Sequence, residues 1–309
     1  MSRLVVVRLG AAFLVMFGAC TLVFLLIHLV PGDPVDAMLG ETARAADRAA
    51  LRAALGLDAP LWQQYLDYLG GLARLDLGRS LREQRPVASI LAERLPPTLL
   101  LASAALSLAL AIAIPLGVLA ARYQHRLIDS LAMSFSLLGV AVPNFWLGPL
   151  LILVFSLWLG WTPVSGMQQP TSLILPAITL GTGLAAILAR MVRATVLEVL
   201  GDDFIRTARA KGLSEGAILR RHALRNAWLP VLTLIGLQLG ALLAGAVITE
   251  TIFAWPGVGS LMVEAIQARD FPVVQGTVLL IAALYVLVNT ATDLAYAALD
   301  PRVSIGSGS

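Results

Sequence analysis

The chain has little of the chemistry on which enzymes and disulfide-stabilised domains depend. Its 309 residues include one cysteine, Cys20, and three histidines, so no disulfide can form within the chain. The histidines are His28, His125 and His222, and their spacing is not that of a metal site. The sequence contains no glycine-rich phosphate-binding loop and no Ser/His/Asp or Cys/His grouping. It therefore predicts no catalytic residues, no metal ligands and no cofactor held by this chain.

Charged side chains are also scarce. They make up 13% of the residues, whereas hydrophobic residues make up 58%. This balance argues against a single soluble domain and makes the lipid bilayer the solvent for most of the chain. We expect a lipid environment and no nucleic-acid partner. Lysine is almost absent, because Lys211 is the only lysine among the 22 basic residues.

Six apolar runs are each long enough to cross a hydrocarbon core about 30 Å thick. The third run is over-long and carries Pro143 and Asn144 in its middle, which predicts either a kinked helix or a span broken by a short irregular segment. The expected spans are Leu9–Val30, Thr98–Ala121, Leu131–Leu159, Leu173–Ala194, Leu229–Thr251 and Val273–Ala298. The predicted fold class is an all-α integral membrane protein with six transmembrane helices.

Arginines in the short loops predict the orientation of these spans. Eight basic residues lie between Arg190 and Arg225, whereas the loop after the third span has no charge. Both termini and the loop 195–228 are therefore expected on the cytoplasmic side. We expect residues 1–30 to be a retained transmembrane helix rather than a signal peptide. Residues 303–309 are interpreted as a tail that ends in an artificial Gly-Ser linker.

Residues 31–97 are the one sizeable polar region expected on the outer face. We predict an extracytoplasmic cap with short helices at Glu41–Leu55, Leu61–Leu72 and Pro86–Leu95, the second of them broken by its two glycines. Eight arginines and nine acidic residues leave this region nearly neutral, so its field should not attract charged ligands. The rest, residues 98–302, is expected to form the transmembrane domain.

A polar stretch separates the fourth and fifth apolar runs. It is expected to form a short helix with Phe204, Ile205 and Ala208 on one face, ended by Gly212. On charge alone, a solvated loop that obeys the positive-inside rule explains the stretch as well. The residues singled out are Asp203, Phe204, Ile205, Arg206, Thr207, Ala208, Arg209, Ala210, Lys211, Gly212 and Leu213.

This stretch resembles the cytoplasmic "EAA" loop of ABC-importer permeases, most of all in the dipeptide, oligopeptide and nickel branch of that family. Gly212 matches the glycine of the motif, whereas Arg206-Thr-Ala208 stands where the general motif has Glu-Ala-Ala. That departure is similar to the peptide branch. The strings Pro31–Pro34, Ile252–Gly259 and Asp300–Arg302 extend the resemblance over most of the chain.

The resemblance implies the type I ABC importer fold and a permease subunit that is not itself an enzyme. The implied partners are a second homologous permease subunit, two cytoplasmic ATP-binding subunits and an extracytoplasmic substrate-binding protein. ATP and Mg²⁺ would be held by the ATP-binding subunits. The implied location is the bacterial cytoplasmic (inner) membrane. The loop 195–228 would couple ATPase closure to the spans, and the cargo would be a dipeptide or short oligopeptide, or alternatively nickel or a nickel complex.

Four further residues are candidates for the translocation path. Pro143 frees a backbone carbonyl within a span, and Asn144 beside it is polar. Glu250 lies near the outer end of the fifth run, and Trp255 suits the membrane interface. Structural roles explain them as well: a kink at Pro143, or a pairing of Glu250 with an arginine of the cap.

Two other classes of membrane protein fit the sequence less well. A stand-alone channel or secondary transporter often shows an inverted repeat or ionisable residues at the midplane, and neither is evident in this sequence. A membrane-anchored sensor needs an output domain, and the sequence offers no candidate for one. Co-purification of ATPase subunits would separate an importer subunit from both alternatives.

Overall fold

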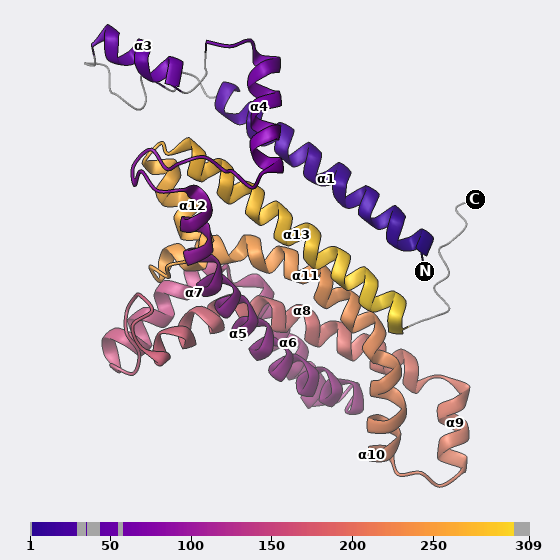
Figure 1. The fold of residues 1–309 in the computed structure, drawn as a ribbon. Helices are drawn as coiled ribbons and strands as arrows, with labels where there is room; N and C mark the ends of the chain where they lie inside the picture. Colours follow the sequence, from indigo (N-terminus) through magenta and orange to yellow (C-terminus); the bar gives the residue numbers. More distant parts are fainter. Residues whose placement is uncertain (1, 30–34, 36–43, 55–57, 300–309) are drawn as a thin grey trace. The chain divides into compact units, whose positions relative to one another are not determined.

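The computed structural model describes residues 2–29, 35, 44–54 and 58–299, and every regular element within them is a helix (Figure 1). The described elements are α1 (Ser2–Leu29), α3 (Ala45–Ala54), α4 (Leu61–Ala73), α5 (Val87–Arg122), α6 (Leu127–Ala141), α7 (Asn144–Leu151), the π-helix η1 (Ile152–Trp158), the 3₁₀ helix η2 (Pro170–Leu173), α8 (Ile174–Leu200), α9 (Asp203–Ala210), α10 (Glu215–Ile218), the π-helix η3 (Leu219–Ala223), α11 (Leu224–Ile252), α12 (Val258–Gln267) and α13 (Phe271–Leu299).

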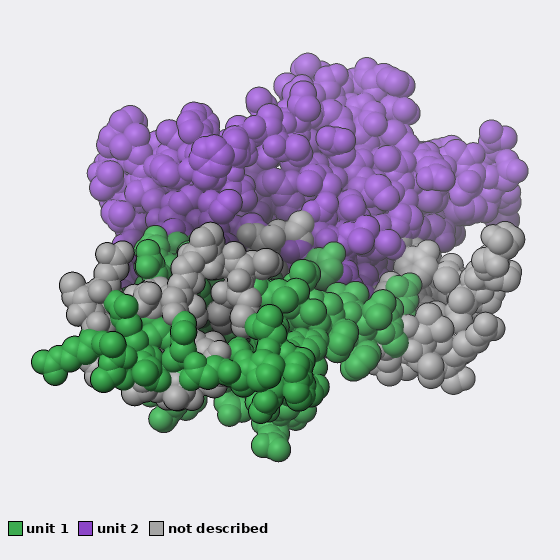
Figure 2. Space-filling model, turned by 90° about the horizontal axis from the view of Figure 1, so that it is seen from above, with its two compact units in different colours: residues 1–96, 257–286 green, residues 97–256, 287–309 purple. Residues whose placement is uncertain are grey.

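The chain divides into two compact units, which Figure 2 distinguishes by colour. Unit 1 combines residues 1–96 with 257–286, and unit 2 combines 97–256 with 287–309. The first boundary falls between Pro96 and Pro97, inside α5. This division differs from the predicted one into 1–30, 31–97 and 98–302, which stays a prediction.

Among the residues that the structure describes, three helices are long and apolar enough to cross a membrane: Val87–Arg122, Pro170–Leu200 and Phe271–Thr292. Two bent pairs of helices raise the number of candidate spans to five. The first expected span coincides with α1, which runs over 28 residues, and its stretch Gly10–Leu25 is an apolar helix. Several apolar helices are therefore confirmed, whereas the count of six spans is not.

The third expected span is broken at Pro143, as its sequence predicted. Helix α6 and the segment Asn144–Trp158 meet at a bend of 100°. Val142 is extended, with ψ of 115°, which is the backbone region that a following proline favours. The Pro143 carbonyl accepts the amides of Trp146 and Leu147, both at 3.0 Å, and so begins α7. A proline ends one helix and starts the next.

Some predicted helix boundaries in residues 31–97 are wrong. The separate helix expected at Pro86–Leu95 is instead the first part of α5, which continues through Pro96 and Pro97 into the expected span. Helix α4 also continues through its two glycines to Ala73. The helix expected at Glu41–Leu55 is described only as α3, because residues 41–43 and 55 lie outside the described residues.

Within unit 1, two sets of polar contacts tie the predicted cap residues to helices. The hydroxyls of Tyr65 on α4 and Thr21 on α1 lie 2.7 Å apart. The buried carboxylate of Asp270 accepts the Ser80 hydroxyl at 2.5 Å and the Leu81 amide at 3.2 Å. Since Asp270 directly precedes α13, its carboxylate fixes the turn before α5 to the start of the last helix.

Unit 2 has a continuous apolar core built largely from alanine. Ala105, Ala109 and Ala113 of α5 lie in the same buried cluster as Ala185 of α8. At Gly181 the two helices approach so closely that a Cβ would lie 2.8 Å from the Ala105 carbonyl oxygen. In lipid, small residues of this kind let helices pack by close backbone contact.

Candidate functional site

The polar stretch between α8 and α11 folds into two short helices, α9 and α10, which extend beyond the ends of their neighbours (Figure 1). We call residues 201–218 the α9–α10 lobe. The lobe leaves α8 at Gly201 and enters α11 through η3. The short helix expected to end before Gly212 is therefore present, as α9.

The inner face of the lobe is apolar and small. Ile205 and Ile218 are fully buried, Ala208 nearly so, and Leu200 and Leu213 pack against them. These contacts hold α9 and α10 against each other.

The sequence pattern placed Phe204 on the inner face with Ile205, and this prediction is wrong. The side chain of Phe204 is 42% exposed, whereas that of Ile205 is fully buried. Successive residues on a helix are turned by about 100°. The inner face is therefore formed by Ile205 and Ala208, three positions apart, and Phe204 is left outside it.

Helix α9 ends in a Schellman motif built around Gly212. Gly212 has a φ of +77°, in the left-handed region that glycine adopts without strain. Its amide donates to the Arg209 carbonyl at 2.9 Å, and the Leu213 amide donates to the Ala208 carbonyl at 3.3 Å. These are the two hydrogen bonds of the motif. A Cβ at residue 212 would meet nothing within 4 Å, so backbone conformation and not crowding requires the glycine.

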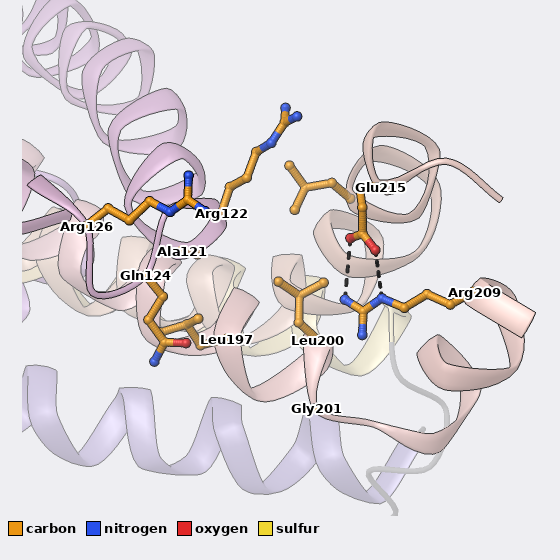
Figure 3. A pocket seen from close by; sticks show the side chains of 10 residues that line it. Ala121, Arg122, Gln124, Arg126, Leu197, Leu200, Gly201, Arg209 and Glu215 are labelled. Carbon is orange, nitrogen blue, oxygen red and sulfur yellow. Dashed lines mark hydrogen bonds and ion pairs between the residues drawn. The ribbon is translucent and has the colours of Figure 1, made fainter. Parts of the chain in front are cut away.

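An ion pair closes the open side of the lobe. Nε of Arg209 donates to Oε1 of Glu215 at 2.8 Å, and Nη2 donates to Oε2 at 3.4 Å (Figure 3). The hydrogen bond from Arg209 lowers the pKa of Glu215, and partial burial opposes this only in part. The residue pattern singled out Arg209 but not Glu215. An acidic residue six positions after an arginine, with a glycine turn between them, was the signal that could have predicted this ion pair.

The outer face of the lobe carries most of the candidate residues. Phe204 lies there among basic side chains, and arginine with an exposed aromatic is the composition typical of protein–protein interfaces. The exposed candidates are Asp203, Phe204, Arg206, Thr207, Arg209, Ala210, Lys211 and Gly212.

Helix η3 joins the lobe firmly to the bundle. Leu219 and Ala223 are buried in the same core as Val196 and Val199 of α8. The Ser214 hydroxyl accepts the Ala217 amide at 3.4 Å and caps α10. Because both ends of the lobe are fixed in the core, a force on it acts directly on α8 and α11.

A buried ion pair, missed at the sequence level, links the same end of α8 to α6. Nε of Arg193 donates to Oδ1 of Asp129 at 2.6 Å, and Nη2 donates to Oδ2 at 2.7 Å. The His125 amide also donates to Oδ2, at 3.0 Å. Asp129 is 4% exposed. Asp129 and Arg193 each lie at the end of an apolar run. Opposite charges at two such ends were the signal that could have predicted their pairing.

Pro143 and Asn144 lie at the break between α6 and α7. Pro143 is exposed and Asn144 is half-buried. A Cβ at Gly245 of α11 would lie 3.9 Å from Nδ2 of Asn144 and 3.3 Å from Cδ1 of Leu180. The Asn144 amide therefore approaches α11 where that helix has no side chain.

Glu250 and Trp255 both contact the first third of α5, and both are buried, at 0% and 1% exposure. The Thr98 hydroxyl donates to Oε1 of Glu250 at 2.7 Å. Nε1 of Trp255 donates to the Pro97 carbonyl at 2.9 Å. The structure thus places Trp255 inside the packing and not on an interfacial surface, and one partner of the Glu250 carboxylate is a hydroxyl.

No three His, Cys, Asp or Glu side chains among the described residues come together as metal ligands. The candidate residues instead form a short helical lobe, a glycine turn and buried polar contacts.

The comparisons with known proteins decide the family. The model for the binding-protein-dependent transport system inner membrane component matches residues 113–305, and the model for its N-terminal region matches residues 1–102. The chain belongs to this family.

Curated relatives match the chain over nearly its whole length. The dipeptide transport system permease protein DppB of Escherichia coli K12 is 43% identical, covering 98% of this chain and 99% of that protein. The di/tripeptide transport system permease protein DppB of Pseudomonas aeruginosa UCBPP-PA14 is 46% identical, covering 96% and 97%. The glutathione transport system permease protein GsiC of E. coli K12 is 41% identical, covering 98% and 99%.

Solved structures show the same fold at low sequence identity. A chain of the inward-facing MetNI methionine ABC transporter matches with a TM-score of 0.59 and 20% identity, covering 69% of this chain and 97% of that one. A chain of an amino acid ABC transporter matches with a TM-score of 0.52 and 17% identity, covering 70% and 95%. The chain has the type I ABC importer fold.

The chain is accordingly a multi-pass membrane protein and a permease subunit of an ABC importer. It works with ATP-binding subunits and a substrate-binding protein. ATP hydrolysis belongs to separate subunits, so the chain is not an enzyme.

Proposed function

We propose that the chain forms half of the translocation path of an importer for dipeptides or short oligopeptides. Three relatives that it matches over nearly their full length are named for dipeptides, di/tripeptides and glutathione, which are all short peptides. A second homologous permease would form the other half, with two ATP-binding subunits on the cytoplasmic side and the binding protein docked on the outer side of a bacterial inner membrane. Both termini would be cytoplasmic.

The α9–α10 lobe is proposed as the part that an ATP-binding subunit grips, with residues Asp203–Leu213 as the coupling segment. The observation that carries this assignment is the division between its two faces. Ile205 and Ile218 fix the inner face, whereas Phe204 and the basic residues of the outer face are exposed. Closure of the ATPase would move the lobe, and η3 and α8 would pass the displacement to the spans.

For the path itself, Pro143 and Asn144 are proposed as lining residues, because the break between α6 and α7 leaves backbone and amide groups inside a span. Glu250 and Trp255 are proposed to line the path only in part of the transport cycle. Since both are buried within the chain, they would reach the path only when the helices around Pro97 separate during the transport cycle.

A crosslinking experiment tests the coupling assignment. With Cys20→Ser as background, Ala210→Cys should form a crosslink to an ATP-binding subunit in the assembled complex. Ala208→Cys is the matched control, because the two alanines lie two positions apart on α9 and Ala208 is buried. Equal crosslinking of both variants, or of neither, would contradict the assignment. Labelling of Ala210→Cys by a membrane-impermeant thiol reagent outside intact cells would overturn the topology.

Transport by the reconstituted complex tests the cargo separately. Uptake of a labelled dipeptide should require the binding protein and ATP, and excess unlabelled di- and tripeptides should compete with it. Competition by a nickel complex but not by peptides would assign the transporter to the alternative cargo.

A further inference from the structure

A pocket of about 470 Å³ lies in unit 2, beside the base of the α9–α10 lobe. It is enclosed by the end of α5, the turn into α6, the end of α8 and the two helices of the lobe (Figure 3). Its charged lining side chains are Arg122, Arg126, Arg209 and Glu215. The charged lining therefore consists of three arginines and one glutamate.

The carboxylate is already occupied. Both oxygens of Glu215 accept hydrogen bonds from Arg209, and Arg122 acts on this carboxylate through its charge alone, without a hydrogen bond. Two positive charges, those of Arg122 and Arg126, remain at the opposite side of the pocket. An anion that enters the pocket would meet this excess of positive charge.

The two remaining arginines have donors to spare. Among the described residues, neither side chain donates to a protein acceptor, and both guanidinium groups instead lie near the ring of Tyr123, at 5.5 and 6.0 Å from its centroid. Both side chains are exposed, and a guanidinium edge carries paired N–H groups that match two oxygens of a phosphate.

The pocket also lies where phosphate groups are concentrated. Arg122 is the last residue of α5 and Arg126 directly precedes α6, and both helices belong to candidate membrane spans. The ends of membrane spans lie at the level of the lipid headgroups. Basic pockets between transmembrane helices are a known way to hold anionic headgroups.

We propose that Arg122 and Arg126 make this pocket a binding site for a phosphate group, carried by an anionic phospholipid or by free phosphate. The ligand would sit against α5 and α6 on one side and the base of the lobe on the other. This site does not depend on which cargo the importer carries, although Arg209, which lines it, also belongs to the proposed coupling segment.

Calorimetric titration of the purified complex in neutral detergent tests the site, with short-chain phosphatidylglycerol, short-chain phosphatidylcholine and inorganic phosphate as probes. Phosphatidylglycerol should bind at least about tenfold more tightly than phosphatidylcholine, whose choline cancels the phosphate charge. The double variant Arg122→Ala/Arg126→Ala should raise the Kd for phosphatidylglycerol at least about tenfold, the usual scale for losing a charge-assisted hydrogen bond.

Arg221→Ala is the matched control, because Arg221 is an exposed arginine of η3 outside the pocket, and its Kd should stay within about twofold of the unaltered protein. If the alanine pair fails to assemble, Arg122→Gln/Arg126→Gln replaces it with the same expected weakening. Binding of inorganic phosphate that displaces the lipid would identify free phosphate as the ligand. An unchanged Kd in the double variant, or an equal loss in Arg221→Ala, would overturn the proposal.

Discussion

The α9–α10 lobe and the bundle to which it is attached are held together by different kinds of contact. The bundle packs α5, α8 and α11 over a long cluster of alanines and leucines, and a bidentate ion pair joins α6 to α8. The lobe relies on Ile205, Ala208 and Ile218, one glycine turn and exposed ion pairs. Short helices are marginal in isolation, and a buried core of three residues adds little to the stability of these two.

Because of this difference, the bundle should determine whether the subunit folds, and the exposed face of the lobe should determine how it couples to its partner. Substitutions in the bundle should impair the whole subunit, because the helices there touch through their backbones. Substitutions on the exposed face of the lobe should leave the subunit folded and change only what the lobe contacts.

Arg193→Gln should be the most damaging single change in the bundle. It leaves the carboxylate of Asp129 buried with only the His125 amide as a donor, and breaking a buried pair in this way costs about 3–5 kcal/mol. The thermal unfolding midpoint of the complex should fall by several degrees. Arg190→Gln is the control, because Arg190 is exposed and lies three residues earlier on α8. Equal midpoints for the two variants would show that the ion pair is dispensable.

Ile205→Ala and Phe204→Ala should separate the two faces of the lobe. Removing the buried Ile205 side chain should cost about 2–5 kcal/mol of local stability, seen as faster amide exchange throughout α9 and α10. Phe204→Ala should leave exchange unchanged and weaken retention of the ATP-binding subunit during purification. If Phe204→Ala instead loosens the lobe, the assignment of its outer face is wrong.

Gly181→Ala should destabilise the bundle by about 1–3 kcal/mol, the usual cost of overpacking. The new Cβ would lie 2.8 Å from the backbone carbonyl oxygen of Ala105 in α5. Because this atom belongs to the backbone, no side-chain rotation can relieve the contact. Gly183→Ala on the same helix is the control, since its Cβ would lie 3.8 Å from the nearest atom. Thermal midpoints of the two variants should differ; identical midpoints would mean that α5 and α8 are packed less tightly than described.

Glu215→Gln should have the smallest effect, because the ion pair with Arg209 is largely exposed and surface pairs contribute little. The folded protein lowers the pKa of Glu215. The contribution of the pair is therefore present above the carboxyl pKa of the unfolded chain and is lost as the pH falls through the folded pKa. Amide exchange of α10 in the unaltered protein and in Glu215→Gln should differ at pH 7 and converge under acidic conditions. A difference that persists in acid would contradict this origin.

The sequence predicted those features that depend on local chemistry. The break at Pro143 follows from the missing amide of proline, and the end of α9 follows from the left-handed conformation of Gly212. Apolar length predicted several spans, and helices long and apolar enough to cross a membrane are found at three of the expected places. The two prolines before Thr98 were read as a helix boundary, but α5 runs through them, so tertiary packing overrode a local signal.

What the sequence could not supply was which distant residues meet. The pairing of Asp129 with Arg193 spans 64 positions, and that of Thr98 with Glu250 spans 152. A polar side chain within or beside an apolar run needs a hydrogen-bonding partner. The sequence offers several possible partners for each such side chain and does not distinguish between them. The exposure of Phe204 was missed for a related reason, because an eight-residue helix has too few turns to define its inner face.

The ratio of peptide uptake to ATP hydrolysis in Gly212→Asp tests the central claim most directly. The left-handed conformation at Gly212 would be strained by any Cβ, and the free space around it lets the variant fold. We predict that the complex assembles and hydrolyses ATP while peptide uptake in proteoliposomes falls at least about tenfold. Normal uptake per ATP hydrolysed would contradict the claim that the α9–α10 lobe couples hydrolysis to transport.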